Sequence, residues 1–385
     1  MVTDDFESTD MEGSFPHRTG KRPRIEDTEL YPCKKSRHKL IPRVESTGGG
    51  IETSTYNPRR LLSTDMLKLT YDINAHWPPP ITYQPQNVNA SNKKNPHIGQ
   101  LKLQLSEMQL LINTCTKTAP MLCVYVGAAP CIHLIHILRL FPNTFFLLVD
   151  PAICLIEQWY HNKDYHRFVK DGRVATVWER FNHRSVGAIT SWFDHMSRTP
   201  LDRQGRASSC CVPGLGIYDA LSTLKLPDTF SYARSGKFDC FTNLLFISDL
   251  RRVAKDEMSI TRDMEDQQRW FQNMKAHAAL LKFRPPFAGE GETYECRYLK
   301  GTIFLPIFGP RSTTECRLLL RAGARRESYS YEDHERRMAG FNSLRSSRFY
   351  IEGDGVEYGG TYDAVAARLV WLQYHQWNRG ISVSE

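Results

Sequence analysis

The sequence predicts an α/β fold, a mostly parallel doubly wound sheet with an antiparallel strand near its end. Two apolar segments, residues 121–126 and 145–149, predict strands, because a strand covered on both faces needs no polar alternation. Between them lie a turn of small residues, Gly127 to Ala129, and an apolar pattern with helical spacing. The second strand delivers Asp150 about twenty residues after the turn, which is the order of a dinucleotide-type site.

This stretch leaves two interpretations open. A single glycine turn is a weak signal, and Cys131 stands where a second glycine would be expected. The stretch is therefore compatible with a nucleotide or S-adenosylmethionine site and also with a plain α/β core. We expect Pro130 to begin the following helix, because proline suits the first helical position.

Further elements extend the sheet on both sides of this stretch. Residues 100–112 have apolar side chains at helical spacing, with Lys102 beside them. Residues 184–236 are polar and glycine-bearing and predict a long insertion or mobile loop. The remaining predicted strands are 174–178, 244–247, 278–281, 302–308 and 315–320, and the remaining helices are 258–276, 331–341 and 363–377, with Gly380 ending the last. This alternation predicts the doubly wound arrangement.

Length and composition limit the class of protein. A chain of 385 residues that is 41% hydrophobic can bury a large core in one or two domains. It has no apolar run of the roughly eighteen residues that a membrane helix needs, and we expect an intracellular protein that does not contact a membrane. The ten cysteines include no C-x-x-C pair, so they predict neither zinc ligands nor a disulfide framework. The net charge of +8 is compatible with nucleic acid but does not require it.

The first part of the chain, residues 1–60, predicts a disordered basic arm, because it is poor in large apolar residues. It contains two basic clusters, at 21–24 and 34–39. Two clusters at this spacing are typical of a bipartite nuclear import signal, and we expect a nuclear protein that binds an import receptor. A basic arm that contacts RNA phosphates is the alternative.

Four charged residues occupy the ends of different predicted elements: Lys102, Asp249, Lys282 and Glu315. In an open α/β sheet, ligands bind beyond the carboxyl ends of the strands, so Asp249 and Lys282 should project toward the crevice of Gly127. Each residue also has a structural explanation when taken alone. Asp249 could cap a helix, the two lysines could lie on the surface, and Glu315 could pair with a neighbouring arginine.

Five sequence blocks occur in the order found in the poxvirus-type cap-specific messenger-RNA 2′-O-methyltransferases, and the chain resembles that family over residues 81–350. The basic arm is unlike the cytoplasmic viral enzymes and more similar to nuclear relatives in kinetoplastids, which methylate riboses of a heavily modified cap. The blocks are Gly99-Gln100-Leu101-Lys102-Leu103, residues 124–130, Ser248-Asp249-Leu250-Arg251, residues 281–287 and Glu315-Cys316-Arg317-Leu318-Leu319. The resemblance implies a Rossmann-like S-adenosylmethionine-dependent methyltransferase domain over residues 61–385, with the insertion at about 184–236, acting on capped RNA of the messenger or spliced-leader type.

The resemblance implies that Lys102, Asp249, Lys282 and Glu315 form a catalytic tetrad. Lys282 would be the general base for the ribose 2′-hydroxyl. An amine accepts a proton only when it is neutral, and burial and a nearby cation such as Lys102 favour that form. Asp249 and Glu315 would orient the two amines, and the attacking oxygen would displace the methyl group in line.

The implied cofactor is S-adenosylmethionine, and no metal is expected. Asp150 would accept hydrogen bonds from the cofactor ribose. Taken alone, His133 is also explained as a hydrogen-bonded histidine on a helix face, and a side chain at Cys131 could narrow the pocket. The residues that match the family's cofactor site are Gln100, Tyr125, Gly127, Ala129, Pro130, His133, Asp150, Asp249 and Arg251.

Cap binding, as the resemblance implies it, uses two aromatic faces and a carboxylate to hold a methylated, positively charged base. Tyr83 and Phe287 would stack on the base and Glu335 would read its edge, although either aromatic could instead pack on the core. Arg284 and Arg317 are expected to bind RNA. They belong to a wider set of arginines suited to phosphates, with Arg325, Arg326, Arg345 and Arg348.

Two other functions stay open. A non-catalytic subunit that binds caps or RNA would explain why Cys131 stands where a glycine is expected. A 2′-O-methyltransferase of another RNA, ribosomal or transfer, would keep the tetrad but would not need the sandwich of Tyr83 and Phe287.

Overall fold

The described part of the protein, in this computed structural model, consists of residues 60–69, 96–152, 163–196, 216–224, 241–252, 256–286, 295–310, 313–345, 347–353 and 356–380. The predicted basic arm lies outside these residues, apart from Arg60, and so do Tyr83 and Phe287. All the described residues belong to one compact unit of the chain.

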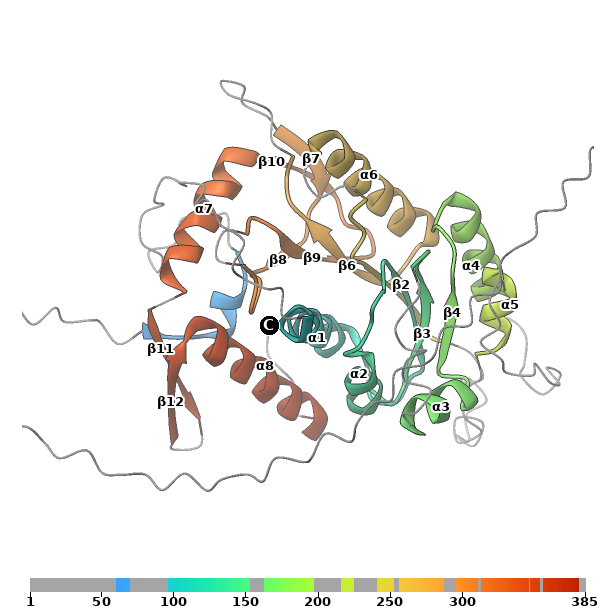
Figure 1. The fold of residues 1–385 in the computed structure, drawn as a ribbon, viewed down its shortest axis with the longest axis horizontal. Helices are drawn as coiled ribbons and strands as arrows, with labels where there is room; N and C mark the ends of the chain where they lie inside the picture. Colours follow the sequence, from blue (N-terminus) through green and yellow to red (C-terminus); the bar gives the residue numbers. More distant parts are fainter. Residues whose placement is uncertain are drawn as a thin grey trace, which may run out of the picture. The chain divides into compact units, whose positions relative to one another are not determined.

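A sheet of seven strands, in the order β4-β3-β2-β5-β6-β9-β8, forms the centre of this unit (Figure 1). Neighbours from β4 to β6 are parallel, whereas β9 is antiparallel to both β6 and β8. This confirms the predicted α/β class and the mostly parallel sheet with an antiparallel strand near its end. The strands are β2 Met121–Val126, β3 Thr144–Val149, β4 Val174–Val177, β5 Asn243–Ser248, β6 Ala278–Phe283, β8 Thr302–Phe304 and β9 Cys316–Arg321.

Helices cover both faces of this sheet. Figure 1 shows α1, α2 and α8 on one side and α4, α5 and α6 on the other. All six residues of β2 and all six of β3 are buried, as expected of strands between two helical layers. The helices are α1 Pro96–Thr114, α2 Leu134–Leu140, α3 Lys163–Lys170, α4 His183–Met196, α5 Ile217–Ser222, α6 Glu257–Met274, α7 Tyr331–Leu344 and α8 Tyr362–Arg379.

Local chemistry explains where two of the predicted helices begin or end. The side chain of Asp256 accepts hydrogen bonds from the backbone N–H groups of Met258 and Ser259 and so caps α6. Gly380 follows α8 with φ of 80°, a left-handed conformation that glycine adopts without strain, and it ends the helix as predicted.

Two smaller sheets were not predicted. One pairs β7 Glu295–Leu299 with β10 Arg326–Ser330, and the other joins β1 Arg60–Leu61, β11 Arg348–Gly353 and β12 Val356–Thr361. A short 3₁₀ helix, η1 Thr64–Leu67, follows β1. These strands are short and mostly partnered by distant segments, so no local pattern marks them.

Three sequence predictions need correction. Parts of the predicted 184–236 loop are helical, because α4 buries Val186, Ile189 and Trp192, spaced three residues apart, against the core. Pro130 does not begin a helix: it follows a cis peptide bond, and α2 starts at Leu134. The strand predicted over 302–308 ends at Phe304.

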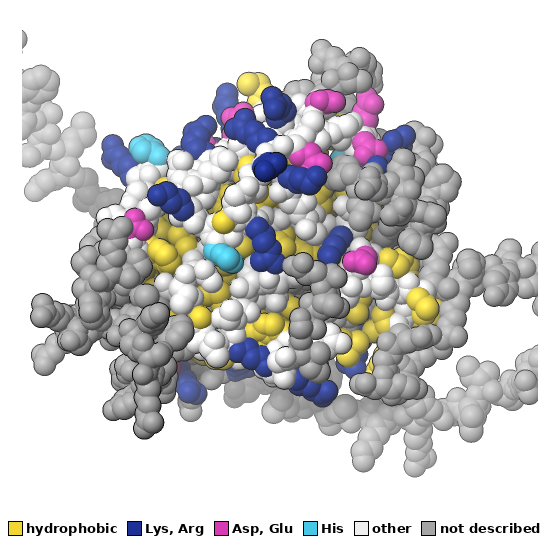
Figure 2. All heavy atoms as spheres, turned by 180° about the vertical axis from the view of Figure 1, so that it is seen from behind, with side chains coloured by type: hydrophobic (Ala, Val, Ile, Leu, Met, Phe, Trp, Pro, Cys, Tyr) yellow, Lys and Arg dark blue, Asp and Glu magenta, His cyan; other side chains and the backbone are white. Residues whose placement is uncertain are grey.

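On the face of the described residues that Figure 2 shows, the basic side chains are spread out rather than gathered in one patch. Figure 2 shows Lys and Arg side chains over much of one face, with Asp and Glu mostly toward its upper part. Among the described helices, none is long and apolar enough to span a bilayer.

Candidate functional site

One edge of the central sheet brings four polar residues and Gly127, from five strands, to the same level. The registers pair Val149 with Val126, Val126 with Ser248, and Ser248 with Leu281. One residue further toward the carboxyl edge, this row continues as Asp150, Gly127, Asp249 and Lys282, and Lys282 pairs directly with Arg317 of antiparallel β9. The sheet itself therefore collects residues that are distant in the sequence at its carboxyl edge, where ligands of open α/β sheets bind.

The four charged residues singled out in the sequence meet at this edge. Lys282 Nζ lies 3.2 Å from Asp249 Oδ1 and 3.4 Å from Glu315 Oε2. Lys102, delivered by α1, places its Nζ 3.6 Å from Glu315 Oε1. Glu315 thus stands between the two lysines, and all four side chains are mostly buried, with between 13% and 24% of each exposed.

Two arginines complete what we call the charged cluster, which comprises Lys102, Asp249, Arg251, Lys282, Glu315 and Arg317. Arg317 donates to Asp249 Oδ1 at 2.6 Å, the same oxygen that faces Lys282. This shared carboxylate separates two cations that lie directly opposite each other on neighbouring strands, an arrangement that would otherwise be repulsive. Arg251 lies 3.7 Å from Glu315 Oε2.

The electrostatics of the charged cluster follow from four cations around two carboxylates. Burial alone would raise the pKa of Asp249, but Arg317, Lys282 and Lys102 outweigh it and hold that pKa below its usual range. Burial likewise works against the ionised form of Glu315, and Lys282, Lys102 and Arg317 again keep its pKa low. The pKa of Lys102 is lowered, first by burial and then by Arg317. Both acids are therefore ionised, and the positive surplus favours release of a proton from a lysine.

Both the backbone conformation at position 127 and the neighbouring strand require glycine there. Its φ is 73°, and a Cβ at this position would lie 3.0 Å from the backbone carbon of Asp249. The close approach to Gly127 is therefore made by the segment that carries Asp249. Gly127 sets the distance between the turn after β2 and the charged cluster.

Asp150 holds the turn after β2 in place. Its Oδ2 accepts from the backbone N–H of Ala129 at 3.0 Å, and its Oδ1 accepts from that of Ala152 at 2.7 Å. Each carboxylate oxygen can accept a second hydrogen bond. Asp150 therefore positions the turn and keeps acceptor capacity for a ligand hydroxyl.

A buried chain of hydrogen bonds, which sequence reasoning missed, ties α1 to the same turn. Gln100 Oε1 accepts from the backbone N–H of Ile132 at 2.8 Å and lies 2.9 Å from His133 Nδ1. His133 Nε2 lies 2.7 Å from Glu107 Oε1. Because Gln100 Oε1 is an acceptor here, His133 Nδ1 donates, and one proton is held between Nε2 and the carboxyl of Glu107.

This chain of hydrogen bonds occupies two residues that were expected to contact a cofactor. Both ring nitrogens of His133 and the side-chain oxygen of Gln100 bind within the protein. They position the turn and connect it to the helix that carries Lys102. The only sequence signal for Glu107 is its place on α1, one helical turn and a residue after Lys102.

Tyr125, another predicted cofactor residue, lies in β2, and Cys131, which stands where a glycine was expected, follows that strand. Tyr125 is fully buried and, among the described residues, its hydroxyl has no hydrogen-bond partner; burial raises its pKa. Cys131 is buried with φ of 56°, a left-handed conformation that favours glycine. The backbone thus keeps the geometry for which a second glycine was expected, although a side chain fills the position.

The residues expected to contact RNA and the cap are separated by the structure. Arg284 pairs with Glu257 at 2.5 Å at the start of α6, whereas Arg317 is buried in the charged cluster. Arg345 is also buried and donates twice to Asp363, at 2.7 and 2.8 Å. Glu335 lies one turn along α7 from Tyr331 and hydrogen-bonds with it, near Arg284.

Comparisons with known proteins identified no family that matches the chain. A scan against protein-family models gave no match to the chain, and a search of curated proteins gave none either. In the described part of the chain, no group of three or more His, Cys, Asp or Glu side chains is placed to hold a metal ion.

Proposed function

We propose that this protein is an S-adenosylmethionine-dependent methyltransferase that modifies a ribose 2′-hydroxyl next to or near the 5′ cap of RNA in the nucleus. The observation that carries the proposal is the charged cluster, in which Lys282 stands within 3.4 Å of both Asp249 and Glu315 at the carboxyl edge of the sheet. The Rossmann-like sheet and the sequence blocks that resemble cap 2′-O-methyltransferases support it.

The residues at this edge fit S-adenosylmethionine. Asp150 retains acceptor capacity for ribose hydroxyls. The buried guanidinium of Arg251 forms no hydrogen bond with the described residues and offers donors to a ligand oxygen. When bound, S-adenosylmethionine would supply an electrophilic methyl group.

The chain's own residues would carry the rest of the reaction. Lys282 takes the proton of the 2′-hydroxyl and makes its oxygen a nucleophile. Asp249 and Glu315 hold the Lys282 amine between them, which fixes its direction toward the substrate. Lys102, Arg251 and Arg317 surround the same two carboxylates, and burial followed by Arg317 lowers the pKa of Lys102 itself.

The test is transfer of labelled methyl from S-adenosylmethionine to short capped and uncapped RNAs, with nuclease mapping of the product. The proposal expects label in a ribose near the cap and little in uncapped RNA. Label in uncapped ribosomal or transfer RNA alone would instead favour a methyltransferase of another RNA. Cap binding without any transfer by the folded protein would favour a non-catalytic binding subunit, the alternative that the side chain at Cys131 suggests.

A further inference from the structure

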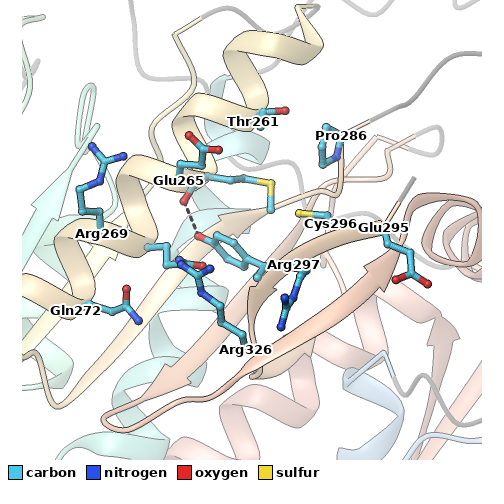
Figure 3. A pocket seen from close by; sticks show the side chains of 12 residues that line it. Thr261, Glu265, Arg269, Gln272, Pro286, Glu295, Cys296, Arg297 and Arg326 are labelled. Carbon is cyan, nitrogen blue, oxygen red and sulfur yellow. Dashed lines mark hydrogen bonds between the residues drawn. The ribbon is translucent and has the colours of Figure 1, made fainter. Parts of the chain in front are cut away.

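A second pocket lies away from the charged cluster, between α6 and the pair of strands β7 and β10 (Figure 3). Its volume is about 500 Å³, within the range of small-molecule sites. One face of α6 forms the first wall, from Thr261 to Gln272 at spacings of three and four residues, and none of the residues of the charged cluster lines it.

The inner part of this pocket contains a polar group without a partner. Gln268 is only 7% exposed, and its Oε1 forms no hydrogen bond with any of the described residues. A buried polar atom left unsatisfied costs about 1–3 kcal/mol. Beside it the buried Tyr298 donates to the carbonyl oxygen of Met264 at 3.0 Å, dashed in Figure 3, which fixes the ring as an apolar surface. Because this oxygen has almost no accessible surface, a ligand in the pocket would reach it only after the Gln268 side chain turns toward the cavity.

The rim of the pocket carries charged side chains of both signs. Three arginines and two glutamates line it. Glu295 accepts from Ser328 Oγ at 2.7 Å, and Arg269 pairs with Asp266 at 3.6 Å.

The other two arginines, Arg297 and Arg326, form no ion pair with described residues. Figure 3 shows Arg326 extending from β10 toward α6. A guanidinium suits phosphate because it donates two parallel hydrogen bonds. Glu265 and Glu295 offset the charge of these two arginines, so the phosphate would be held by hydrogen-bond geometry rather than by a surplus of positive charge.

The pocket is equipped for binding rather than covalent chemistry. Burial, and then the charge of Glu265, raise the pKa of Cys296 to about 11. The thiol is therefore protonated near neutral pH and is neither a nucleophile nor a metal ligand.

We propose that this pocket binds one nucleotide, with its phosphate on Arg297 and Arg326 and its base or ribose at Gln268. The ligand is either a free nucleoside monophosphate or one nucleotide of a single-stranded RNA. Pro286, which closes one end of the pocket, lies four residues after Lys282, and that length of chain spans at most about 14 Å. An RNA whose ribose reaches Lys282 would therefore pass close to the pocket. The inference that the bound nucleotide belongs to an RNA rests on the proposed function, whereas the inference that the pocket binds a nucleotide does not.

The experiment measures binding of two probes, uridine 5′-monophosphate and a short uncapped oligouridylate, by calorimetry and fluorescence anisotropy. Saturating S-adenosylhomocysteine is present so that the proposed cofactor site cannot capture either probe. The variants are Arg326→Glu, whose side chain is exposed, and Gln268→Leu. Arg262→Glu is the matched control, because Arg262 lies exposed on α6 without lining the pocket.

The proposal expects saturable binding that falls at least about tenfold in Arg326→Glu and Gln268→Leu and less than about twofold in Arg262→Glu. Binding of the monophosphate identifies a free nucleotide as a ligand; binding of the oligouridylate alone identifies RNA. Absence of binding by both probes, or equal loss in the control, would overturn the proposal. Methyl transfer is assayed separately with wild type, so failure of the catalytic proposal and failure of this one are distinguishable.

Discussion

At the scale of single residues, Gly127 links the turn after β2 to the charged cluster, and its substitution has a defined cost. We predict that Gly127→Ala lowers the free energy of unfolding by about 2 kcal/mol or more, from the left-handed backbone and from the contact with Asp249. Chemical denaturation measures this. Gly323→Ala is the control: its φ is also positive, at 79°, but a Cβ there meets nothing within 4 Å, and it should cost only about 1 kcal/mol. Equal losses at the two sites would show that the contact with Asp249 is unimportant.

Arg317, which was expected to bind RNA, lies inside the charged cluster. Because it is buried against Asp249 at 2.6 Å, we predict that Arg317→Leu destabilises the protein by about 3 kcal/mol. Urea denaturation tests this, and the exposed Arg262→Leu should stay within about 0.5 kcal/mol of wild type. A stable Arg317→Leu protein with weakened RNA affinity would contradict the structural role and support the RNA-binding role.

How far the sequence predicts the candidate site depends on the kind of evidence each residue offers. Lys102, Asp249, Lys282 and Glu315 were found because charged side chains at the ends of apolar segments are uncommon, and the structure places them together. The residues next to a cation in the sequence do not show whether it is buried, so the position of Arg317 inside the charged cluster was not predicted. It depends on β9 pairing with β6.

At the scale of elements, the hydrogen bonds through Glu107, His133 and Gln100 join α1 to the turn after β2. We predict that Glu107→Leu leaves His133 Nε2 unpartnered and lowers the free energy of unfolding by about 1–3 kcal/mol. In the same variant, hydrogen exchange at the Ile132 amide, which donates to Gln100, should be faster than in wild type.

Glu107→Gln is the matched control for this prediction. The amide of a glutamine can donate to the neutral His133 Nε2, so this variant should retain the connection and slow exchange at Ile132. If Glu107→Leu and Glu107→Gln exchange at the same rate as wild type, the connection does not hold the turn.

The elements predicted best were those with a continuous local pattern. The apolar runs of β2, β3 and β5 and the capped helix α6 each have a signal within their own residues. The helix α4 was missed because its apolar residues are separated by polar ones and by Gly187. The strands β7 and β10 expose alternate residues and pair across a distance in the sequence, which composition does not reveal.

At the scale of the whole molecule, the charged cluster makes stability depend on pH in a definite direction. The pKa values of Asp249 and Glu315 are held below their usual range in the folded protein. Their stabilising contribution is therefore complete above the unfolded values of about 4 and is lost as the pH falls through the lower folded values.

We predict that the free energy of unfolding of wild type drops below about pH 4, and that the variant with both Asp249→Asn and Glu315→Gln drops less over the same range. The variant starts from a lower stability at pH 7, because the surrounding cations lose their partners. Urea denaturation at pH 7, 5 and 3.5 compares the two proteins. Identical pH dependence would mean that these carboxylates are not held ionised by the charged cluster.

The measurement that most directly tests the central claim, that the charged cluster is catalytic, is the single-turnover rate of methyl transfer to capped RNA. We predict that Lys282→Met, which replaces the amine by an apolar side chain of similar length, lowers the rate by about 10²–10⁴-fold. Lys300→Met, at an exposed lysine paired with Glu327, should remain within about twofold of wild type. A Lys282→Met protein that transfers methyl at nearly the wild-type rate would contradict the assignment of Lys282 as the general base.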